Sequence, residues 1–366
     1  MKEKKRKKNK KRKISKISIF LIILVWIIAL IFTLVLLING IRNKSKLKEI
    51  TSQIKIPEGF YYVGGENDKG VVISDNKQDE FKGTEYKNLS KLKGNQFVWV
   101  PVEKAMVSNF EEAEQLVHEG KNPIAIKYKN EYKSIDYAFD SYLKKYIIIE
   151  ENYQNDESRE PYILKSEKNG DSEEYIEGST KYLYQTSFNK MVESVEKNKG
   201  FYISRFEAGN INDAVTNDEK VVSKANDEDI TYQSWIDLYK VIGNMYDRDD
   251  ITTEMIWGCQ WDAVLVWIAS NSELARYIYD SKNIGNYYNK LEKTGSNEKY
   301  CLNNIYDMAG NAYEWTQRGS EGGRNAIGGS NLNDSSLNYS LNDQKIYEIR
   351  NPWKEVGTRI TMYINN

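Results

Sequence analysis

The sequence predicts an α+β domain with short strands, two or more helices and long loops, preceded by one transmembrane helix. Three observations carry this prediction: an uncharged apolar run at 17–38, short β-type segments bounded by glycine or proline, and a few segments whose apolar residues have helical spacing. Short strands and few helices joined by long glycine-rich loops are typical of α+β proteins. The 366 residues suffice for one large domain with its own core.

The apolar run is the first element along the chain. Residues 17–38 carry no charge and follow a basic tail, residues 1–16, that holds eleven Lys and Arg. A helix of this length covers roughly 33 Å, enough to cross a hydrocarbon core. The basic flank places the N-terminus in the cytoplasm and the remainder outside a cell membrane. A cleaved signal peptide is the alternative, but the run is long and a poor cleavage site follows it. Residues 39–53 are predicted as a polar stalk.

Charge is divided unevenly along the chain. The first fifty residues hold 15 Lys and Arg against two Glu, which leaves 37 basic and 51 acidic residues in the remainder. This acidic body argues against a nucleic-acid partner, because phosphate neutralisation needs clustered Lys and Arg. The one histidine, His118, rules out metal sites built on several imidazoles and argues against serine–histidine hydrolysis. Two cysteines are too few for a zinc cluster.

The remaining elements are expected in a single domain over 54–366. Short apolar runs bounded by turn residues predict strands at 56–65, 71–75, 97–102, 200–209 and 356–364. Helical spacing of apolar residues predicts helices at 188–195, 234–246 and 261–268. Residues 103–199 are charged, rich in tyrosine and poorly periodic outside the first of these helices. They are interpreted as an insertion into the domain.

The densest collection of unusual residues is the run 303–316. Asp307 is followed by a Gly-Asn turn at Gly310 and then by alternating residues that include Glu314. Two carboxylates around such a turn can gather oxygens about one point, as a hard cation requires. The alternative is a buried strand led by a polar turn, with the carboxylates in a cap or a salt bridge.

Six short motifs follow one another in a recognisable order, at 97–102, 200–209, 260–263, 305–315, 328–330 and 356–359. The most specific is Ile-Tyr-Asp-Met-Ala-Gly-Asn-Ala-Tyr-Glu-Trp at 305–315. In this order they resemble the sulfatase-modifying-factor family, whose fold is that of formylglycine-generating enzyme and is related to C-type lectins. The resemblance covers about 54–102 and 200–366, and residues 103–199 have no counterpart in it.

The resemblance implies structural calcium rather than a catalytic metal. Its oxygen cluster falls on Asp307, Gly310, Ala312 and Glu314, two of them carboxylates and two of them backbone carbonyl donors. A second cation site of the family falls on Asn286, Tyr287 and Asn297. Arg205 and Arg359 lie in two of the family motifs, and we expect their guanidinium groups to satisfy buried carbonyls or carboxylates.

The chemistry of the family does not transfer in the same way. Its enzymes bind copper through two cysteines shortly after the Gly-Gly-Ser strand, and the matching stretch here, 331–339, has none. Related sulfoxide synthases bind iron through histidines, and His118 lies outside the matched region. No copper or iron is therefore expected, and a non-catalytic role is favoured over an oxidoreductase acting on an exported substrate.

The two cysteines, Cys259 and Cys301, lie elsewhere in the domain. In an exported protein the first interpretation is a disulfide, which would close a loop of about 43 residues and stabilise the fold by about 4 kcal/mol. The alternative is a redox or metal-binding pair.

The stretch 324–346 occupies the position where this fold exposes its ligand-binding face. Its Asn, Ser and Tyr residues suit adaptable hydrogen bonding, and the candidate ligand-binding residues are Asn331, Asn333 and Tyr339. An ordinary polar loop is the alternative. The predicted partner is a surface ligand, either a glycan or a protein. A further possibility is a scaffold in a surface assembly that uses 103–199 as its contact.

Overall fold

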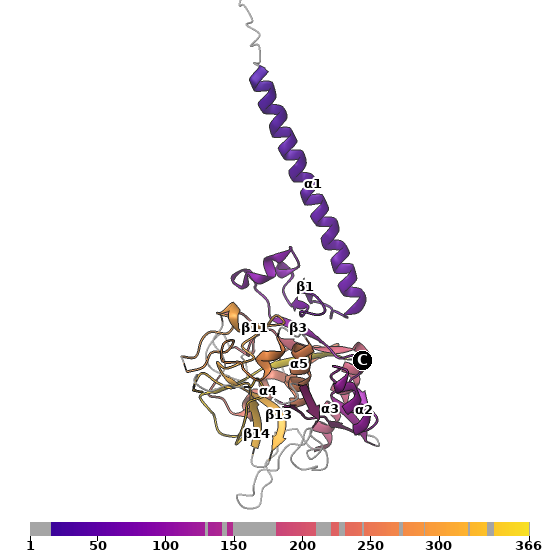
Figure 1. Ribbon diagram of the computed structural model, residues 1–366, viewed down its shortest axis with the longest axis vertical. Coiled ribbons are helices and arrows are strands. Elements are labelled where there is room, and N and C mark those ends of the chain that lie inside the picture. Colours follow the sequence, from indigo (N-terminus) through magenta and orange to yellow (C-terminus); the bar gives the residue numbers. More distant parts are fainter. Residues whose placement is uncertain are drawn as a thin grey trace, which may run out of the picture. The chain divides into compact units, whose positions relative to one another are not determined.

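The computed structural model describes residues 16–365 apart from ten gaps, at 129–130, 141–144, 149–180, 210–220, 227–230, 244, 271–273, 289, 321–322 and 335–339. The chain divides into two units, residues 1–53 and 54–366. The described part of the first is a single helix, and the second is a mixed α/β domain with several sheets (Figure 1). The predicted mixture of short strands, helices and loops is confirmed at this level.

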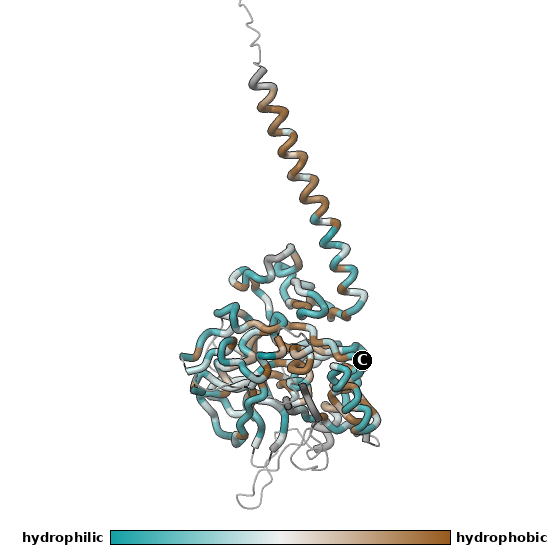
Figure 2. Tube along the Cα trace, viewed as in Figure 1, coloured by the Kyte–Doolittle hydropathy of each residue, from teal (hydrophilic) through white to brown (hydrophobic). Residues whose placement is uncertain are grey.

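The helix of the first unit is α1 (Lys16–Gln53). Its span Phe20–Gln53 is long and apolar enough to cross a membrane, and its apolar side chains are exposed. Figure 2 shows this apolar stretch in brown. Such a helix is consistent with a membrane anchor or a signal sequence. The predicted stalk, 39–53, continues the same helix, since it contains no proline and several good helix formers.

A six-stranded sheet forms one layer of the second unit. All its neighbouring strands are antiparallel, in the order β1 (Tyr61–Gly64), β2 (Val72–Ser74), β3 (Gln96–Pro101), β9 (Gly200–Ser204), β17 (Ile360–Ile364) and β10 (Ile251–Met255). Four of these strands lie within the predicted segments, and β3 begins one residue before its segment. The sixth, β10, was not predicted, because its five residues include only two apolar ones, Ile251 and Met255.

A four-stranded sheet follows from the C-terminal third of the chain. Its order is β15 (Gln344–Tyr347), β14 (Gly323–Ile327), β13 (Tyr313–Ser320) and β16 (Val356–Thr358). Strand β16 pairs parallel with β13, and the chain then passes through Arg359 into β17 of the larger sheet. A short ribbon of β11 (Cys301–Leu302) and β12 (Ile305–Tyr306) leads into the turn before β13.

The helices of this unit are α2 (Phe110–His118), α3 (Lys181–Asn198), α4 (Trp235–Gly243) and α5 (Gly258–Ser270). Helix α5 is buried from Gly258 through Ile268, so it is a core helix. The three predicted helical segments coincide with α3, α4 and α5. Short 3-10 turns complete the unit: η1 (Lys77–Asp79), η2 (Thr84–Lys87), η3 (Leu89–Lys91), η5 (Ala275–Ile278) and η6 (Glu298–Tyr300).

The segment interpreted as an insertion, 103–199, contributes to the core of the domain. Besides α2 and α3 it holds β4 (Met106–Val107), β5 (Ala125–Tyr128), β6 (Glu131–Ser134), β7 (Tyr137–Asp140) and β8 (Lys145–Ile148). Its described part supplies fully buried residues to the main cluster, such as Phe188 and Met191. Tyr137 N donates to Asp262 Oδ2 at 2.9 Å, and Asn122 Nδ2 donates to Ala263 O at 3.1 Å. These bonds tie the segment to α5.

Candidate ligand-binding face

Asp307, the first predicted calcium ligand, lies directly after β12. Its backbone is in the left-handed region, with φ of 57°. The carboxylate Oδ2 accepts hydrogen bonds from Thr294 Oγ1 at 2.9 Å and from Gly295 N at 2.7 Å. Burial raises the pKa of Asp307 to about 6, although both donors act in the opposite direction. The side chain therefore fastens the 294–295 loop to the end of β12.

Glu314, the second predicted carboxylate ligand, lies on β13 and faces Arg359. Arg359 Nη2 donates to Glu314 Oε1 at 2.5 Å, and Nε donates to the two carboxylate oxygens at 3.0 and 2.8 Å. The same guanidinium donates to Tyr306 O at 2.8 Å and Ser204 O at 3.1 Å. Burial raises the pKa of Glu314, against the attraction of Arg359. The ion pair joins the two sheets, and the structural role predicted for Arg359 is confirmed.

Arg205 has a comparable role on the other side of the β11–β12 ribbon. Its Nε donates to Asn304 O at 3.2 Å, and its Nη1 donates to Tyr86 O at 3.2 Å and Gln96 Oε1 at 2.7 Å. The guanidinium carbon also lies 5.5 Å from the ring centre of Tyr306. This predicted structural role is likewise confirmed.

The predicted calcium quartet is close in sequence, but both of its carboxylates already accept hydrogen bonds from protein donors. Gly310 N donates to Gly328 O at 2.8 Å, and Ala312 N donates to Glu207 Oε1 at 3.2 Å. Among the residues that the structure describes, no group of three or more His, Cys, Asp or Glu side chains is placed to hold a metal ion. As arranged, the quartet does not fit calcium, because the ion would have to displace the guanidinium from Glu314. Calcium binding at these positions is an untested expectation of the family resemblance, and the contacts of Glu314 with Arg359 argue against it.

The residues of the second predicted cation site have three separate roles. Asn286 Nδ2 donates to Lys290 O and to Asn311 Oδ1, each at 2.9 Å. The Tyr287 hydroxyl shares a 2.7 Å hydrogen bond with Ser281 Oγ. Asn297 caps η6 by accepting a hydrogen bond from the backbone N–H two residues later. These contacts order the 285–299 loop.

Asn311 is the point at which three loops meet. Its Nδ2 donates to Glu207 Oε2 at 2.7 Å and to Glu292 O at 3.1 Å, and its Oδ1 accepts from Asn286 Nδ2 and Glu292 N, each at 2.9 Å. Its backbone O accepts from Asn331 N at 2.8 Å. The residue is 1 % exposed and has φ of 58°, a conformation that asparagine tolerates better than most residues. One buried residue therefore links three loops: its side chain holds 285–292 and Glu207 against 310–312, and its backbone carbonyl holds 328–333.

These loops carry unusually exposed apolar side chains. Tyr288 is 76 % exposed, Leu332 65 % and Leu291 39 %. We use the name Asn311 loop face for the residues Tyr288, Leu291, Asn331, Leu332 and Asn333, which lie on the loops joined at Asn311. Its three apolar residues were not singled out from the sequence, where the available signal was an apolar residue inside an otherwise polar, Asn-rich loop.

The predicted ligand-binding asparagines lie on this face, both half-buried. Asn333 Oδ1 accepts from Ser330 N at 2.7 Å, and its Nδ2 donates to the Tyr313 hydroxyl at 3.1 Å. Asn331 is held through its backbone by Asn311. The third predicted residue, Tyr339, lies outside the described residues. Asn331 and Asn333 therefore shape the loop that carries Leu332.

A polar group borders the face beside Asn333. The Tyr313 hydroxyl donates to Asp343 Oδ2 at 2.6 Å, and the Lys345 ammonium lies 4.7 Å from the centre of the Tyr313 ring. Asp343 is half-buried and Lys345 is exposed. Burial raises the pKa of Tyr313, so its hydroxyl stays protonated and donates to the carboxylate. The Asn311 loop face is therefore bordered, beside Asn333, by the carboxylate of Asp343 and the ammonium group of Lys345.

Cys259 and Cys301 are not joined by a disulfide, so the predicted pairing is not formed. Cys259 lies in the first turn of α5 and belongs to the main hydrophobic cluster, whereas Cys301 begins β11 beside Arg205 and Tyr306. Burial raises the pKa of the Cys301 thiol to about 11, despite the nearby guanidinium. A thiol with such a pKa is a poor nucleophile and a poor metal ligand at neutral pH.

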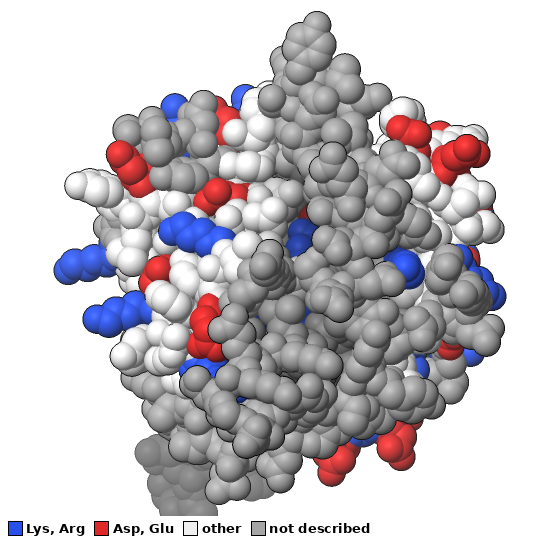
Figure 3. Space-filling model, turned by 90° about the horizontal axis from the view of Figure 1, so that it is seen from below, with Lys and Arg blue, Asp and Glu red and all other residues white. Residues whose placement is uncertain are grey.

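The surface charge is mixed. On the described part of the face shown in Figure 3, Lys and Arg are interspersed with Asp and Glu and do not gather into a patch of one sign. A mixed surface of this kind is not the electrostatic footprint of a nucleic-acid-binding protein.

Comparisons with known proteins add little to this picture. No protein-family model matches the chain, and no curated protein matches it. Among solved structures, variable protein 1 of Treponema denticola is matched at a TM-score of 0.22 and 14 % identity, over 49 % of this chain and 68 % of that one. A likeness this weak carries no inference about fold or function.

Proposed function

We propose that this chain is a single-pass membrane protein whose extracytoplasmic domain is a sulfatase-modifying-factor-like module that binds a surface ligand, a glycan or a protein, without catalysis. The observation that carries the proposal is the Asn311 loop face. It places Tyr288, Leu291 and Leu332 in solvent on loops that are fixed from below by a buried hydrogen-bond network.

The anchor is supported by α1 and by the basic residues that precede it. The helix is apolar and exposed over its membrane-length part, and the tail before it holds eleven Lys and Arg. A basic flank on the cytoplasmic side is the usual topology of such helices. In this topology the domain after residue 54 lies outside the cytoplasm.

A non-catalytic role is supported by the state of the groups that catalysis would use. The Cys301 thiol has a raised pKa. The carboxylates beneath the loops are bound to Arg359, to Asn311 and to backbone N–H groups. His118 ends α2 and is exposed. The described groups near the face stabilise loops and show no nucleophile–base pair.

A binding role is supported by the contrast between the exposed apolar side chains of the Asn311 loop face and the buried hydrogen-bond network around Asn311 that holds their loops. Exposed apolar side chains on loops that are joined at one buried residue are candidates for an interaction site. Tyrosine suits such sites, because a rigid ring supplies contact area at low entropic cost and its hydroxyl remains available for hydrogen bonds. The free-energy cost of ordering the loops on binding should be small, since the hydrogen bonds around Asn311 already fix them.

The test is a binding screen with the full chain in detergent micelles on glycan and peptide arrays. We expect saturable binding to a restricted set of glycans or peptides, and no oxidation of cysteine-containing peptides. Copper or iron near one per molecule together with peptide oxidation would contradict the proposal and favour the oxidoreductase.

The topology is tested separately by adding protease to intact cells. The proposed orientation predicts that the 54–366 domain is digested while a cytoplasmic marker protein survives. Protection of the domain until the cells are lysed would contradict the orientation.

A further inference from the structure

The C-terminal part of α1 carries a group of cations directly after its apolar part. No residue of 17–41 is charged, and four cations then follow within seven residues: Arg42, Lys44, Lys46 and Lys48. Figure 2 shows the corresponding change along the helix from brown to teal. With one carboxylate, Glu49, against these four cations, the segment 39–53 has a net charge of +3.

Three of the cations are open to solvent. Arg42, Lys44 and Lys48 are exposed, and their side chains form no hydrogen bond or ion pair with another described residue. Lys46 is half-buried and already interacts with another group of the chain, so it is not counted here. Glu49 is exposed as well. The segment therefore offers three cations against one carboxylate.

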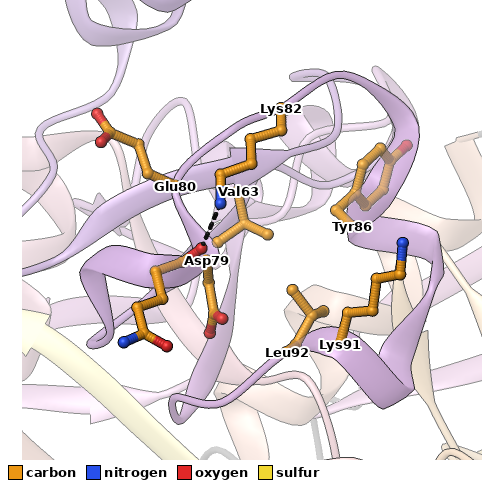
Figure 4. Close-up of a pocket in the computed structure, with 8 residues that line it drawn as sticks. Val63, Asp79, Glu80, Lys82, Tyr86, Lys91 and Leu92 are labelled. Atoms are coloured by element: carbon orange, nitrogen blue, oxygen red, sulfur yellow. Dashed lines mark hydrogen bonds between the residues drawn. The ribbon is translucent and has the colours of Figure 1, made fainter.

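The cavity beside β1 has no such excess of charge. Its volume is about 380 Å³, and its charged lining residues are Asp79, Glu80, Lys82 and Lys91, two carboxylates and two ammonium groups (Figure 4). Because these charges balance, the cavity shows no preference for an anion or a cation. The cations of α1 are the clearer electrostatic feature.

The position of these cations along the helix matches the depth of lipid headgroups. The charge-free run 17–41 covers about 37 Å, whereas the hydrocarbon core of a bilayer is about 30 Å thick and the whole bilayer about 40–45 Å. When α1 spans a bilayer, Arg42 therefore lies in the headgroup layer, and Lys48 follows about 9 Å farther along the axis. Because the Cα–Cβ bonds of a helix tilt toward its N-terminus, we expect these side chains to lean back toward the membrane.

The cations also lie on more than one side of the helix. Lys44 and Lys48 are four positions apart and share one face, whereas Arg42 lies roughly 160° around the axis from Lys44. A protein that docks on one face would contact only part of this set. Headgroups surround a spanning helix on every side, so the arrangement favours lipid over a protein partner.

We propose that the segment 42–48 binds anionic phospholipid headgroups, through Arg42, Lys44 and Lys48, in the leaflet on the C-terminal side of α1. Basic residues next to a membrane span are attracted to the negative charge of such headgroups. The inference rests on the membrane anchor of the proposed function, to which it adds a lipid preference. It does not rest on the orientation, because 42–48 meets a membrane surface in either orientation.

The test is the lipid retained by the full chain. The chain is incorporated into bilayers of equal amounts of phosphatidylglycerol and phosphatidylcholine and extracted with a mild detergent, and the retained lipids are counted by mass spectrometry. We expect the triple variant Arg42→Gln, Lys44→Gln and Lys48→Gln to lower the ratio of retained phosphatidylglycerol to phosphatidylcholine by about threefold or more. The basic tail 1–16 is the same in both proteins, so the difference reports the segment 42–48. An unchanged ratio would overturn the proposal.

A matched control separates position from net charge. The triple variant Lys77→Gln, Lys93→Gln and Lys197→Gln makes the same charge change at exposed positions of the domain, and should leave the ratio within about 1.5-fold of wild type. Equal falls in both triple variants would overturn the proposal. Glutamine is a good helix former, so α1 should persist. If circular dichroism shows lost helix, Lys44→Gln alone replaces the triple variant, with a smaller fall expected and an unchanged ratio contradicting the proposal.

Flotation with vesicles separates this inference from the anchor on which it rests. We expect the wild-type chain and both triple variants to float with vesicles of the same lipid mixture, because 17–41 is unchanged. Flotation without a phosphatidylglycerol preference would overturn the lipid inference and leave the anchor in place. A wild-type chain that does not float would overturn both.

Discussion

Arg359 and Glu314 form a bidentate ion pair between the two main sheets of the domain. Both side chains are fully or almost fully buried, at 0 and 1 % exposure. Arg359 follows β16 of one sheet and precedes β17 of the other, and its remaining donors reach the backbone of β9 and β12. The pair therefore fixes the relative position of the sheets on which the turn at 307–312 is built.

Removal of one partner should be costly. Arg359→Met leaves the Glu314 carboxylate buried without a cation, so we expect the free energy of unfolding to fall by about 3–5 kcal/mol. Arg359→Met combined with Glu314→Leu removes both charges and should lose less than the single variant. Urea unfolding of each variant measures the difference. A single variant as stable as wild type would show that the pair contributes nothing.

Substitution of Asn311 should lower the free energy of unfolding by more than the small size of the side chain suggests. Asn311→Ala leaves several buried donors and acceptors unsatisfied, so we expect a loss of more than about 2 kcal/mol and faster proteolysis within 285–292, the loop that the side chain holds. Asn311→Asp keeps the shape but places a carboxylate next to Glu207, and should also destabilise the loops. Limited proteolysis followed by mass spectrometry locates the cleavage. Cleavage confined to other segments would disprove the role given to Asn311.

Asp262 should make stability depend on pH. Its Oδ2 accepts from Arg318 Nη2 at 2.5 Å, yet burial raises its pKa from 3.8 to about 6. Between these pH values the folded protein holds a proton that the unfolded chain releases. The stabilisation by protonated Asp262 is thus complete below about pH 4, is lost as the pH rises to about 6 and is constant above.

Comparison with Asp262→Asn isolates this contribution. The difference in unfolding free energy between wild type and the variant should fall by about 1–3 kcal/mol from pH 4 to 6.5. Urea titrations at several pH values measure it. A difference that grows with pH would mean that Arg318 lowers the pKa of Asp262 instead.

Calcium should have little effect on stability. Both oxygens of Glu314 accept from Arg359, and Asp307 is bound to Thr294 and Gly295. We therefore expect the melting temperature to be the same with EDTA and with added Ca²⁺. Scanning calorimetry checks this, with Mg²⁺ as the control for general ionic effects. A fall with EDTA that Ca²⁺ alone reverses would support the calcium site that the family resemblance implies.

Local sequence signals predicted the elements better than their connections. Apolar runs bounded by glycine marked β3, β9 and β17, because strand ends need turn residues. Arg359 was expected to satisfy buried groups, but its partner, 45 positions away, could not be identified from spacing. Asn311 was seen only as part of a turn, since its bond to Glu207 spans 104 positions.

The pairing of the cysteines and the role of 103–199 show the same limit. A disulfide between Cys259 and Cys301 was reasonable for a chain expected to be exported, but α5 places Cys259 in the core and β11 places Cys301 against Arg205. The charged composition of 103–199 indicated an insertion, although its apolar minority packs into the main core. Composition averages over a segment, whereas packing depends on the few side chains that turn inward.

The most direct test of a ligand-binding Asn311 loop face compares two tyrosines. Tyr288 lies on the face and Tyr232 lies outside it; both are exposed, at 76 and 55 %, and both have positive φ, of 53° and 61°. The measurement is the affinity of Tyr288→Ala and Tyr232→Ala for the strongest array hit. We expect a loss of about fivefold or more for Tyr288→Ala and less than about twofold for Tyr232→Ala. Equal affinities in the two variants would contradict a binding role for this face.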